Sequence, residues 1–441
     1  MRGTTYHFAL YVYYYLLTHA PKEHPFAKQS LSQLTSLLVT IENGLPMYSL
    51  AGFTGLNLLA VGRPRMQYGT MPNTSMNLDL IGTEIAVKEA ELHGLDFTVE
   101  NFSLSSVKKV TIERCNGPNL SFLQQASNLQ KLNITQSFIE DYSHVNFGSV
   151  VYLQIQSSQV GQTFPGKLLK NCSSLETLVL ENITISDFSC LQACTNLKHL
   201  KLVNVTAAEE PLLEALTKLK KVELLGVSPN LLAMFTKPNQ VQEILLKELT
   251  NASLQPLVGA QKVESLTIEK CSTLNGHALP TLSALKSLVL RNQEKWVFSH
   301  DQPALSGMVA SYLQELSGVQ HLGGLQVLQL RDNALPLDKL YGLFSLKTVR
   351  ITNRVACDVD LAPVTSWPMV ETLSIRGVLE VSDLSPLASL SQLKELAMNP
   401  KVVGKIEVLA QLPNLASVNI TGRMVRSVKK LLPNVKVSTC Y

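Results

Sequence analysis

The sequence runs LETLVLENITISDFSCLQACTN from Leu175 to Asn196 and LKHLKLVNVTAAEEPLLEALTK from Leu197 to Lys218, and both stretches are 22 residues long. Each begins with the pattern L-x-x-L-x-L. When Val, Ile or Met is accepted in place of Leu, fourteen such hexamers recur as a near-regular series between residues 107 and 420. They start at Val107, Leu129, Val150, Leu175, Leu197, Leu219, Val241, Val263, Leu285, Leu325, Leu346, Val370, Leu393 and Leu415. Every step from Leu175 to Leu285 is 22 residues, so the chain is built from a repeated unit.

Two weaker hexamers extend this array. VKEAEL at Val87 stands 20 residues before Val107, and LSGMVA at Leu305 divides the 40-residue gap after Leu285 into two steps of 20. We therefore expect one repeat array of about 14–16 units over residues 85–441.

Residues 1–84 do not follow the period of the array. The stretch LSQLTSLLVTI, Leu31 to Ile41, favours a helix, whereas residues 66–77 are polar and contain Gly and Pro, as loops do. A terminal element is needed to cover the open end of a stacked core. We predict that residues 1–84 form an N-terminal cap.

The physical properties of one unit indicate the fold class. The fourth and sixth residues of each hexamer alternate with outward positions, as in a short strand with one buried face. Glu209 to Leu219, in the second half of one unit, has the apolar spacing of a helix. One unit cannot bury its leucines alone, so stacked units share a core. We predict an α/β solenoid with a curved parallel sheet on its concave side and short helices or turns on its convex side.

This pattern resembles the leucine-rich repeat family, whose unit reads L-x-x-L-x-L-x-x-N/C-x-L. The resemblance covers residues 85–441. Position nine of the unit holds Cys115, Cys271 and Asn333, which are residue types that the family prefers there. The period is similar to the 22-residue class of internalins and of a phosphatase regulatory subunit, with features of the cysteine-containing class. The resemblance implies a solenoid that binds other proteins.

Composition and charge exclude several classes of protein. Hydrophobic residues make up 45% of the chain and charged residues 16%, which argues against disorder. The net charge of +4 and the aromatic content of 6% do not favour nucleic-acid binding. The apolar run at residues 8–17 is too short to cross a bilayer, which takes about 20 residues. We expect no nucleic-acid partner and no stable membrane span.

Two features leave the compartment open. Residues 1–20 have the outline of a weak secretory signal, although the apolar run contains four tyrosines. Nine N-x-S/T sequons occur, about twice the number that chance gives. Either they are glycosylated, or the repeat itself places Asn and Thr in fixed phase, as at Asn182 and Asn204. Cysteines in recurring apolar positions slightly favour an intracellular chain over a secreted one.

The sequence contains no pattern that indicates catalysis, a metal or a cofactor. The motifs HExxH, GxxxxGK[ST], GxSxG and CxxC are absent, and the nine histidines do not cluster. Cys115, Cys172, Cys194 and Cys271 occupy recurring positions of the unit, which favours buried free thiols over metal ligands or disulfides. We predict a protein that is not an enzyme and carries no cofactor.

The outward strand positions hold two groups of candidate binding residues. Positions two, three, five and seven of the unit are expected to face outward on the concave sheet. There the apolar group comprises Val179, Val203, Leu225 and Leu245, and the basic group comprises Arg291, Arg331, Arg350 and Arg376. Such groups suit a partner surface, unless loops cover the apolar residues or Asp332 and Glu371 pair with the arginines.

The function that we predict is non-catalytic binding of a protein partner through the concave face. One alternative is a secreted or cell-surface receptor or adhesin with N-linked glycans. Another alternative is a regulatory subunit of an enzyme such as a protein phosphatase, by analogy of fold.

Overall fold

The computed structural model describes residues 36–40, 57–62, 83–84, 86–95, 102–209, 211–271, 279–332, 337–381, 383–398, 401–402 and 406–439. The chain forms two compact units, Met1–Leu219 (unit 1) and Lys220–Tyr441 (unit 2), and each is described by itself. The weak signal sequence at residues 1–20, Asn333 and Cys440 lie outside the described residues.

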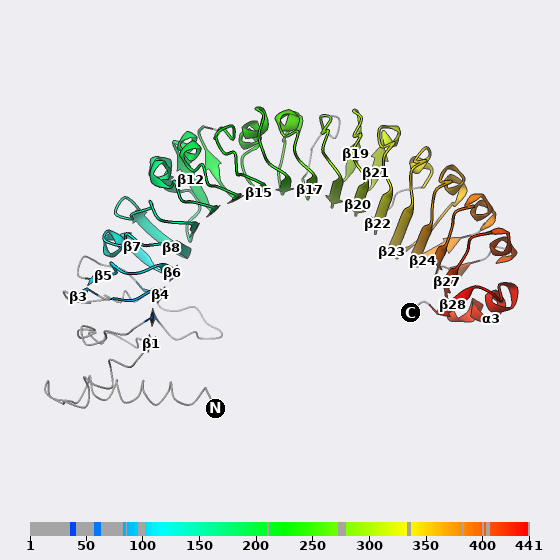
Figure 1. The fold of residues 1–441 in the computed structure, drawn as a ribbon, viewed down its shortest axis with the longest axis horizontal. Helices are drawn as coiled ribbons and strands as arrows, with labels where there is room; N and C mark the ends of the chain where they lie inside the picture. Colours follow the sequence, from blue (N-terminus) through cyan, green and yellow to red (C-terminus); the bar gives the residue numbers. More distant parts are fainter. Residues whose placement is uncertain are drawn as a thin grey trace, which may run out of the picture. The chain divides into compact units, whose positions relative to one another are not determined.

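The strands of unit 1 form a parallel sheet in which neighbours in the chain are neighbours in the sheet (Figure 1). Leu178 lies opposite Leu153 on one side and Leu200 on the other, so equivalent hexamer positions stack. The strands are β1 (Ser36–Thr40), β2 (Leu58–Gly62), β4 (Glu89–His93), β6 (Lys109–Glu113), β8 (Lys131–Asp141), β9 (Tyr152–Ser157), β11 (Thr177–Glu181) and β13 (His199–Val203).

Unit 2 repeats this arrangement (Figure 1). Its sheet contains β15 (Lys221–Leu225), β16 (Glu243–Lys247), β17 (Ser265–Glu269), β18 (Ser287–Arg291), β20 (Gly307–Ser311), β22 (Val327–Arg331), β23 (Thr348–Asp358), β24 (Thr372–Val381), β25 (Glu395–Met398), β27 (Ser417–Ile420) and β28 (Lys436–Thr439). Strand β20 arises from LSGMVA and pairs with β18 and β22, which confirms this weaker hexamer as a repeat. Strand β4 confirms VKEAEL in the same way.

The other side of each unit carries short strands and 3-10 helices (Figure 1). In unit 1 they include β10 (Gln162–Pro165), β12 (Ile183–Ser186), η2 (Gly166–Asn171) and η3 (Phe188–Ala193). In unit 2 they include β19 (Lys295–Val297), β21 (Glu315–Ser317), η4 (Pro229–Phe235), η5 (Gln255–Gly259), η8 (Leu337–Leu340), η9 (Ala362–Ser366), η10 (Ser385–Ser389) and η11 (Ile406–Gln411), followed by the helix α3 (Gly422–Leu431).

The predicted helix over Glu209 to Leu219 is wrong. The N–H groups of Leu216 and Leu219 donate to the carbonyls three residues before them, so this stretch forms successive turns. Leu213, Leu216 and Leu219 are all buried. A spacing of three residues suits turns of this kind as well as one face of a helix.

The helix expected within Leu31 to Ile41 is also wrong, because residues 36–40 form β1. Strands β1 and β2 start 22 residues apart, and β2 pairs with β4 in the register of the later repeats. The parallel sheet therefore extends into the segment that the sequence analysis assigns to the cap. The hexamers LTSLLV at Leu34 and LNLLAV at Leu56 carry this signal.

Buried leucines form the core between the strands and the helical turns. In many of the described strands alternate residues are buried, as in β17, where Leu266 and Ile268 are fully buried and their neighbours are partly exposed. Trp296 and Trp367 add the largest buried side chains to unit 2. The chain thus has the fold of a leucine-rich-repeat solenoid, as the sequence predicts.

Position eight of the unit has left-handed backbone geometry. Non-glycine residues with positive φ recur there, including Asn182, Asn204 and Asn292, and the same position holds Gly94, Gly226 and Gly377. This geometry lets the N–H of Asn182 donate to the carbonyl of Val203 in the next coil at 2.9 Å. Asn and Gly tolerate positive φ better than other residues, which explains their recurrence.

Position nine is where the thiols take part in the backbone hydrogen bonding. The Cys115 thiol donates to the carbonyl of Leu92 in the preceding coil at 3.4 Å, and the Cys271 thiol donates to that of Leu246 at 3.7 Å. These cysteines, with Cys172 and Cys194, are buried and free, which confirms the prediction. A hydrogen bond with Cys194 and burial raise the pKa of the Cys172 thiol well above its usual value.

Candidate interaction surface on the strand face

Positions two, three, five and seven of each unit form the exposed face of the sheet. Buried positions four and six alternate with them, and equivalent positions of neighbouring coils lie opposite each other in register. Adjacent parallel strands are about 4.8 Å apart, so side chains at equivalent positions contact one another. The chemistry of the face therefore depends on which residue each neighbouring coil supplies.

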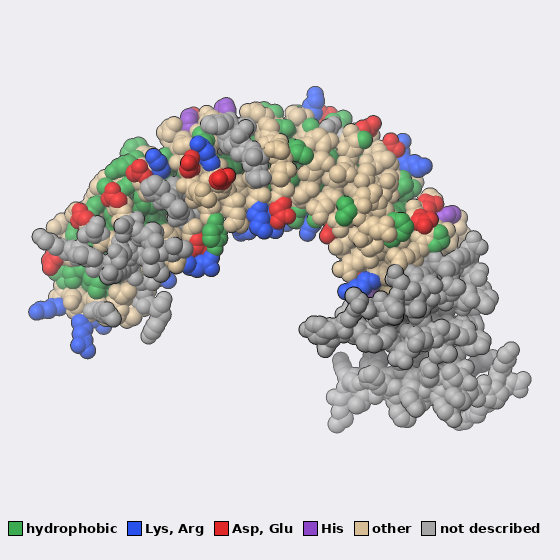
Figure 2. Space-filling view, turned by 180° about the vertical axis from the view of Figure 1, so that it is seen from behind, with side chains coloured by type: hydrophobic (Ala, Val, Ile, Leu, Met, Phe, Trp, Pro, Cys, Tyr) green, Lys and Arg blue, Asp and Glu red, His purple; other side chains and the backbone are tan. Residues whose placement is uncertain are grey.

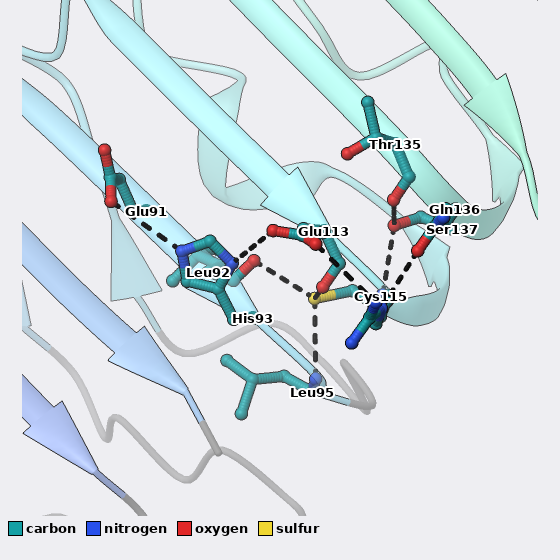
Figure 3. A network of polar contacts seen from close by, with 10 residues as sticks. Glu91, Leu92, His93, Leu95, Glu113, Cys115, Thr135, Gln136 and Ser137 are labelled. Carbon is teal, nitrogen blue, oxygen red and sulfur yellow. Dashed lines mark hydrogen bonds and ion pairs between the residues drawn. The ribbon is translucent and has the colours of Figure 1, made fainter. Parts of the chain in front are cut away.

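In unit 1, charged residues on this face pair with each other. Lys109 contacts Glu89 at 2.9 Å, and His93 lies 3.2 Å from Glu113 and 3.7 Å from Glu91. Figure 3 shows His93 between the two carboxylates, beside the hydrogen bonds of Cys115. Lys109 and Glu89 thus pair with each other within the unit, while Glu91 and Glu113 flank His93.

The four apolar candidates form two diagonal pairs, one in each unit. Val179 lies opposite Lys201, two residues before Val203 on the neighbouring strand. Leu245 lies opposite Glu223, and Leu225 follows Glu223 by two residues. Val179 is only 8% exposed, and the other three are partly exposed. Polar neighbours separate the members of each pair, so each unit presents a small apolar spot.

On β15 to β18 of unit 2, basic residues have acidic partners. Lys221 contacts Glu223 at 2.8 Å, while Glu269 contacts Lys247 at 3.2 Å and Arg291 at 3.5 Å. Burial acts to raise the pKa of Glu269, but its contacts with these two cations outweigh burial and lower it. Arg291, one of the basic candidates, is therefore already paired. Figure 2 shows basic side chains next to acidic ones on the surface of the protein.

Arg331, Arg350 and Arg376, which we call the arginine patch, differ from Arg291. All three are exposed, and among the described residues no carboxylate forms an ion pair with them. Arg331 and Arg376 both lie opposite Thr352, on either side of β23, and Arg350 precedes that threonine by two residues. Side chains two strands apart are about 10 Å apart, so the patch concentrates like charge.

The patch also contains neutral hydrogen-bonding groups. Arg350 lies opposite Gln329 and Ser374, and Arg331 lies opposite Ser311. Arg331 donates to the Gln329 side chain at 3.3 Å. These hydroxyl and amide groups separate the guanidinium groups without neutralising them.

The two carboxylates that could have neutralised the patch are engaged elsewhere. Asp332 accepts from Arg354 at 2.9 Å, and this hydrogen bond lowers the pKa of its carboxyl. Glu371 accepts from Lys394 at 2.7 Å, which likewise lowers the pKa of the Glu371 carboxyl. The expectation that Asp332 and Glu371 could pair with the basic candidates is not met.

Three exposed apolar residues escaped the sequence reasoning. Tyr341, Phe344 and Met369 are 48%, 63% and 49% exposed, and all three precede a hexamer of β23 or β24. The sequence signal for these residues was their place just before a hexamer, because the equivalent residues of other units are mostly small or polar.

Among the described residues, no cluster of His, Cys, Asp and Glu could hold a metal ion. No helix in the described part of the chain is long and apolar enough to cross a membrane.

Comparison with solved structures gives leucine-rich-repeat proteins. The chain matches TLR13 in its complex with ssRNA13 at 18% identity, covering 93% of this chain and 71% of that chain, with a TM-score of 0.52. It matches a leucine-rich-repeat protein of Leptospira interrogans at 16% identity, covering 95% and 99% of the two chains, with a TM-score of 0.49. It matches an internalin, InlF, of Listeria monocytogenes at 21% identity, covering 77% and 88%, with a TM-score of 0.43.

The likeness to TLR13 agrees with the long parallel sheet of repeated strands, and the chain is a leucine-rich-repeat protein by fold. No protein-family model and no curated protein sequence matches it.

Proposed function

We propose that this chain is a non-catalytic interaction module whose unit 2 binds an acidic region of a protein partner through its strand face. The observation that supports this most strongly is the arginine patch, because Arg331, Arg350 and Arg376 are exposed without an ion-pair partner among the described residues. Like charges about 10 Å apart repel each other, and a partner carboxylate relieves that repulsion.

The apolar spot formed by Leu225 and Leu245 supplies a second kind of contact on unit 2. Apolar side chains at the centre of an interface contribute most to affinity, whereas charged groups mainly steer the approach of the partner. Val179 and Val203 form the corresponding spot on unit 1. The paired charges of β15 to β18 add specificity to the face, since an incoming partner has to fit between them.

A binding experiment with variants of these residues tests the proposal. The intact chain is used to isolate bound proteins, and each purified partner is then measured against the parent and against Leu225→Ser with Leu245→Ser. Serine is preferable to glutamate, because Leu245 lies opposite Glu223 and a new carboxylate there would face a like charge. Val258→Ser is the matched control, since Val258 is 50% exposed in η5 on the other side of the sheet.

We expect the double variant to bind at least about tenfold more weakly, with unchanged thermal unfolding, whereas Val258→Ser binds like the parent. If every isolated partner binds the double variant normally and loses affinity for the Val258 variant, the binding surface is not the strand face.

A further inference from the structure

An exposed apolar strip lies at the edge of the sheet where β23 and β24 begin. Tyr341, Phe344 and Met369, which we call the apolar edge, are among the eight large hydrophobic residues that are exposed in the described part of the chain. Three of those eight thus fall on two adjacent coils. Large exposed apolar groups that gather in one place mark interaction sites, whereas single ones do not.

The backbone next to Phe344 leaves this strip open. The Ser345 hydroxyl donates to the carbonyl of Gly323 at 2.6 Å, so the turns before β22 and β23 are in contact. Gly323, two residues before its hexamer, is equivalent to Phe344, and a Cβ added there would meet no atom within 4 Å. On the other side, the N–H of Gly342 donates to the Ser366 hydroxyl at 3.3 Å, which joins the turns before β23 and β24.

The apolar edge is continuous with the arginine patch along β23. Phe344, Lys347 and Arg350 follow one another at steps of three residues, and all three are exposed. Three residues of extended chain span about 10 Å, so Phe344 and Arg350 are at most about 20 Å apart. About six residues of an extended peptide cover that distance.

We propose that the arginine patch and the apolar edge together bind one short acidic peptide segment of a partner protein. This inference rests on the proposed function and specifies its ligand. Carboxylates of the segment contact Arg331, Arg350 and Arg376, and an apolar side chain about six residues away packs on Phe344 and Met369. The segment lies along the line of β23, between the patch and the edge.

The distribution of charge on unit 2 favours a short peptide over a nucleic acid. A polyphosphate chain that runs across the strands would meet the carboxylates on β15 to β17, which are Glu223, Glu243 and Glu269, together with Glu264 just before β17. On the strand face of β22 to β24, the cations without an ion pair among the described residues are Arg331, Lys347, Arg350 and Arg376, and the salt-dependent affinity for a nucleic acid grows with the number of phosphates neutralised. A segment that lies along one strand avoids those carboxylates.

Selection from random peptides tests this inference without a known partner. Phage-displayed peptides of about twelve residues, which span about 40 Å when extended, are selected on the intact chain. Synthetic copies of the selected peptides are then measured by fluorescence anisotropy. The variants are Arg331→Glu with Arg350→Glu, Phe344→Ser with Met369→Ser, and the Val258→Ser control. The substituted side chains are exposed or lie on the outer surface, so the fold should be kept.

We expect the selected peptides to combine Asp or Glu with an aliphatic or aromatic residue. Both double variants should weaken their binding by about tenfold or more, and the control should not. Acidic peptides that lose affinity only in the arginine variant would overturn the shared site and leave the proposed function standing. Peptides without acidic residues, or insensitivity to both variants, would contradict the proposed function as well. Tighter binding of a mixed-sequence single-stranded RNA through the same residues would overturn the peptide assignment.

Discussion

At several residues of the array, Gly377 among them, glycine is required by the close approach of another coil. Gly377 occupies position eight of its unit with φ of 111°, and a Cβ there would lie 1.7 Å from the carbonyl oxygen of Asn353. No rotation of a side chain relieves a contact with backbone. The backbone geometry at Gly377, within β24, therefore depends on the absence of a side chain.

We predict that Gly377→Ala lowers the free energy of unfolding by roughly 3 kcal/mol or more, because the backbone has to move. Gly307→Ala is the control, since its added Cβ would be 3.8 Å from the nearest atom outside its neighbours. Thermal unfolding compares the two. Equal melting temperatures for both variants would mean that the close approach of Gly377 to Asn353 is not as described.

A second prediction for a single residue concerns Glu269, which forms ion pairs with both Lys247 and Arg291. Its folded-state pKa is lowered by Lys247 and Arg291 despite burial, so its contribution to stability is present above about pH 4.5 and is lost as the pH falls below that value. We predict that Glu269→Gln costs on the order of 1 kcal/mol at pH 7 and progressively less towards pH 3. Urea unfolding of both proteins across this range measures the difference. A cost that does not change with pH would show that charge is not its source.

The strands are the elements on which the core depends. Leu200 at position four of its hexamer is fully buried between Leu178 of β11 and the rest of the core, as the repeat phase predicts. Since each coil buries its leucines only against its neighbours, damage to one strand should spread to the adjoining ones.

We predict that Leu200→Asp destabilises unit 1 by several kcal/mol, because it places an unpaired charge in the core. Leu200→Met keeps the volume and should cost less than about 1.5 kcal/mol. Thermal unfolding and amide hydrogen exchange of β11 and β13 show both effects. If Leu200→Asp unfolds at the temperature of the parent, the repeat phase is wrong.

The periodicity of the hexamers made the strands predictable, whereas the structure of the segments between the strands was harder to predict. The alternation in hexamers such as LETLVL identifies which side chains are buried, and this holds even for the weak hexamer at Leu305. The spacing of Leu213, Leu216 and Leu219 did not distinguish turns from a helix, because both bury every third residue. The first two strands were missed because glycine, proline and polar residues surround their hexamers.

The sequence predicts where the residues of the candidate site lie, but it does not predict which of them form ion pairs. Outward positions follow from alternation, so the places of Arg331 and Arg350 could be inferred from the sequence. The pairing of Asp332 with Arg354 depends on the register between coils and on side-chain conformation, which the sequence does not specify. The same holds for Arg291, whose partner Glu269 lies in the preceding coil.

At the scale of the whole molecule, glycosylation of the sequons would distinguish an intracellular chain from a secreted or cell-surface one. Asn171, Asn204 and Asn251 are exposed, whereas the Oδ1 atoms of Asn133 and Asn419 are buried. An intracellular chain, which the cysteines favour, should migrate at 48.5 kDa whether or not it is treated with N-glycosidase. A shift in mobility on treatment would favour the receptor or adhesin, and mass spectrometry should then find glycans at the exposed asparagines.

The central claim is that the arginine patch of unit 2 meets an acidic partner, and the association rate at varied ionic strength tests it most directly. Surface-binding kinetics compare the parent, Arg331→Glu with Arg350→Glu, and Arg426→Glu with Lys429→Glu, which makes the same change of net charge in α3. We predict that the first double variant associates about tenfold more slowly at low salt, loses most of its salt dependence and changes little in dissociation. The α3 variant should behave like the parent. Equal slowing in the two double variants would mean that net charge alone steers the partner, and the claim would be contradicted.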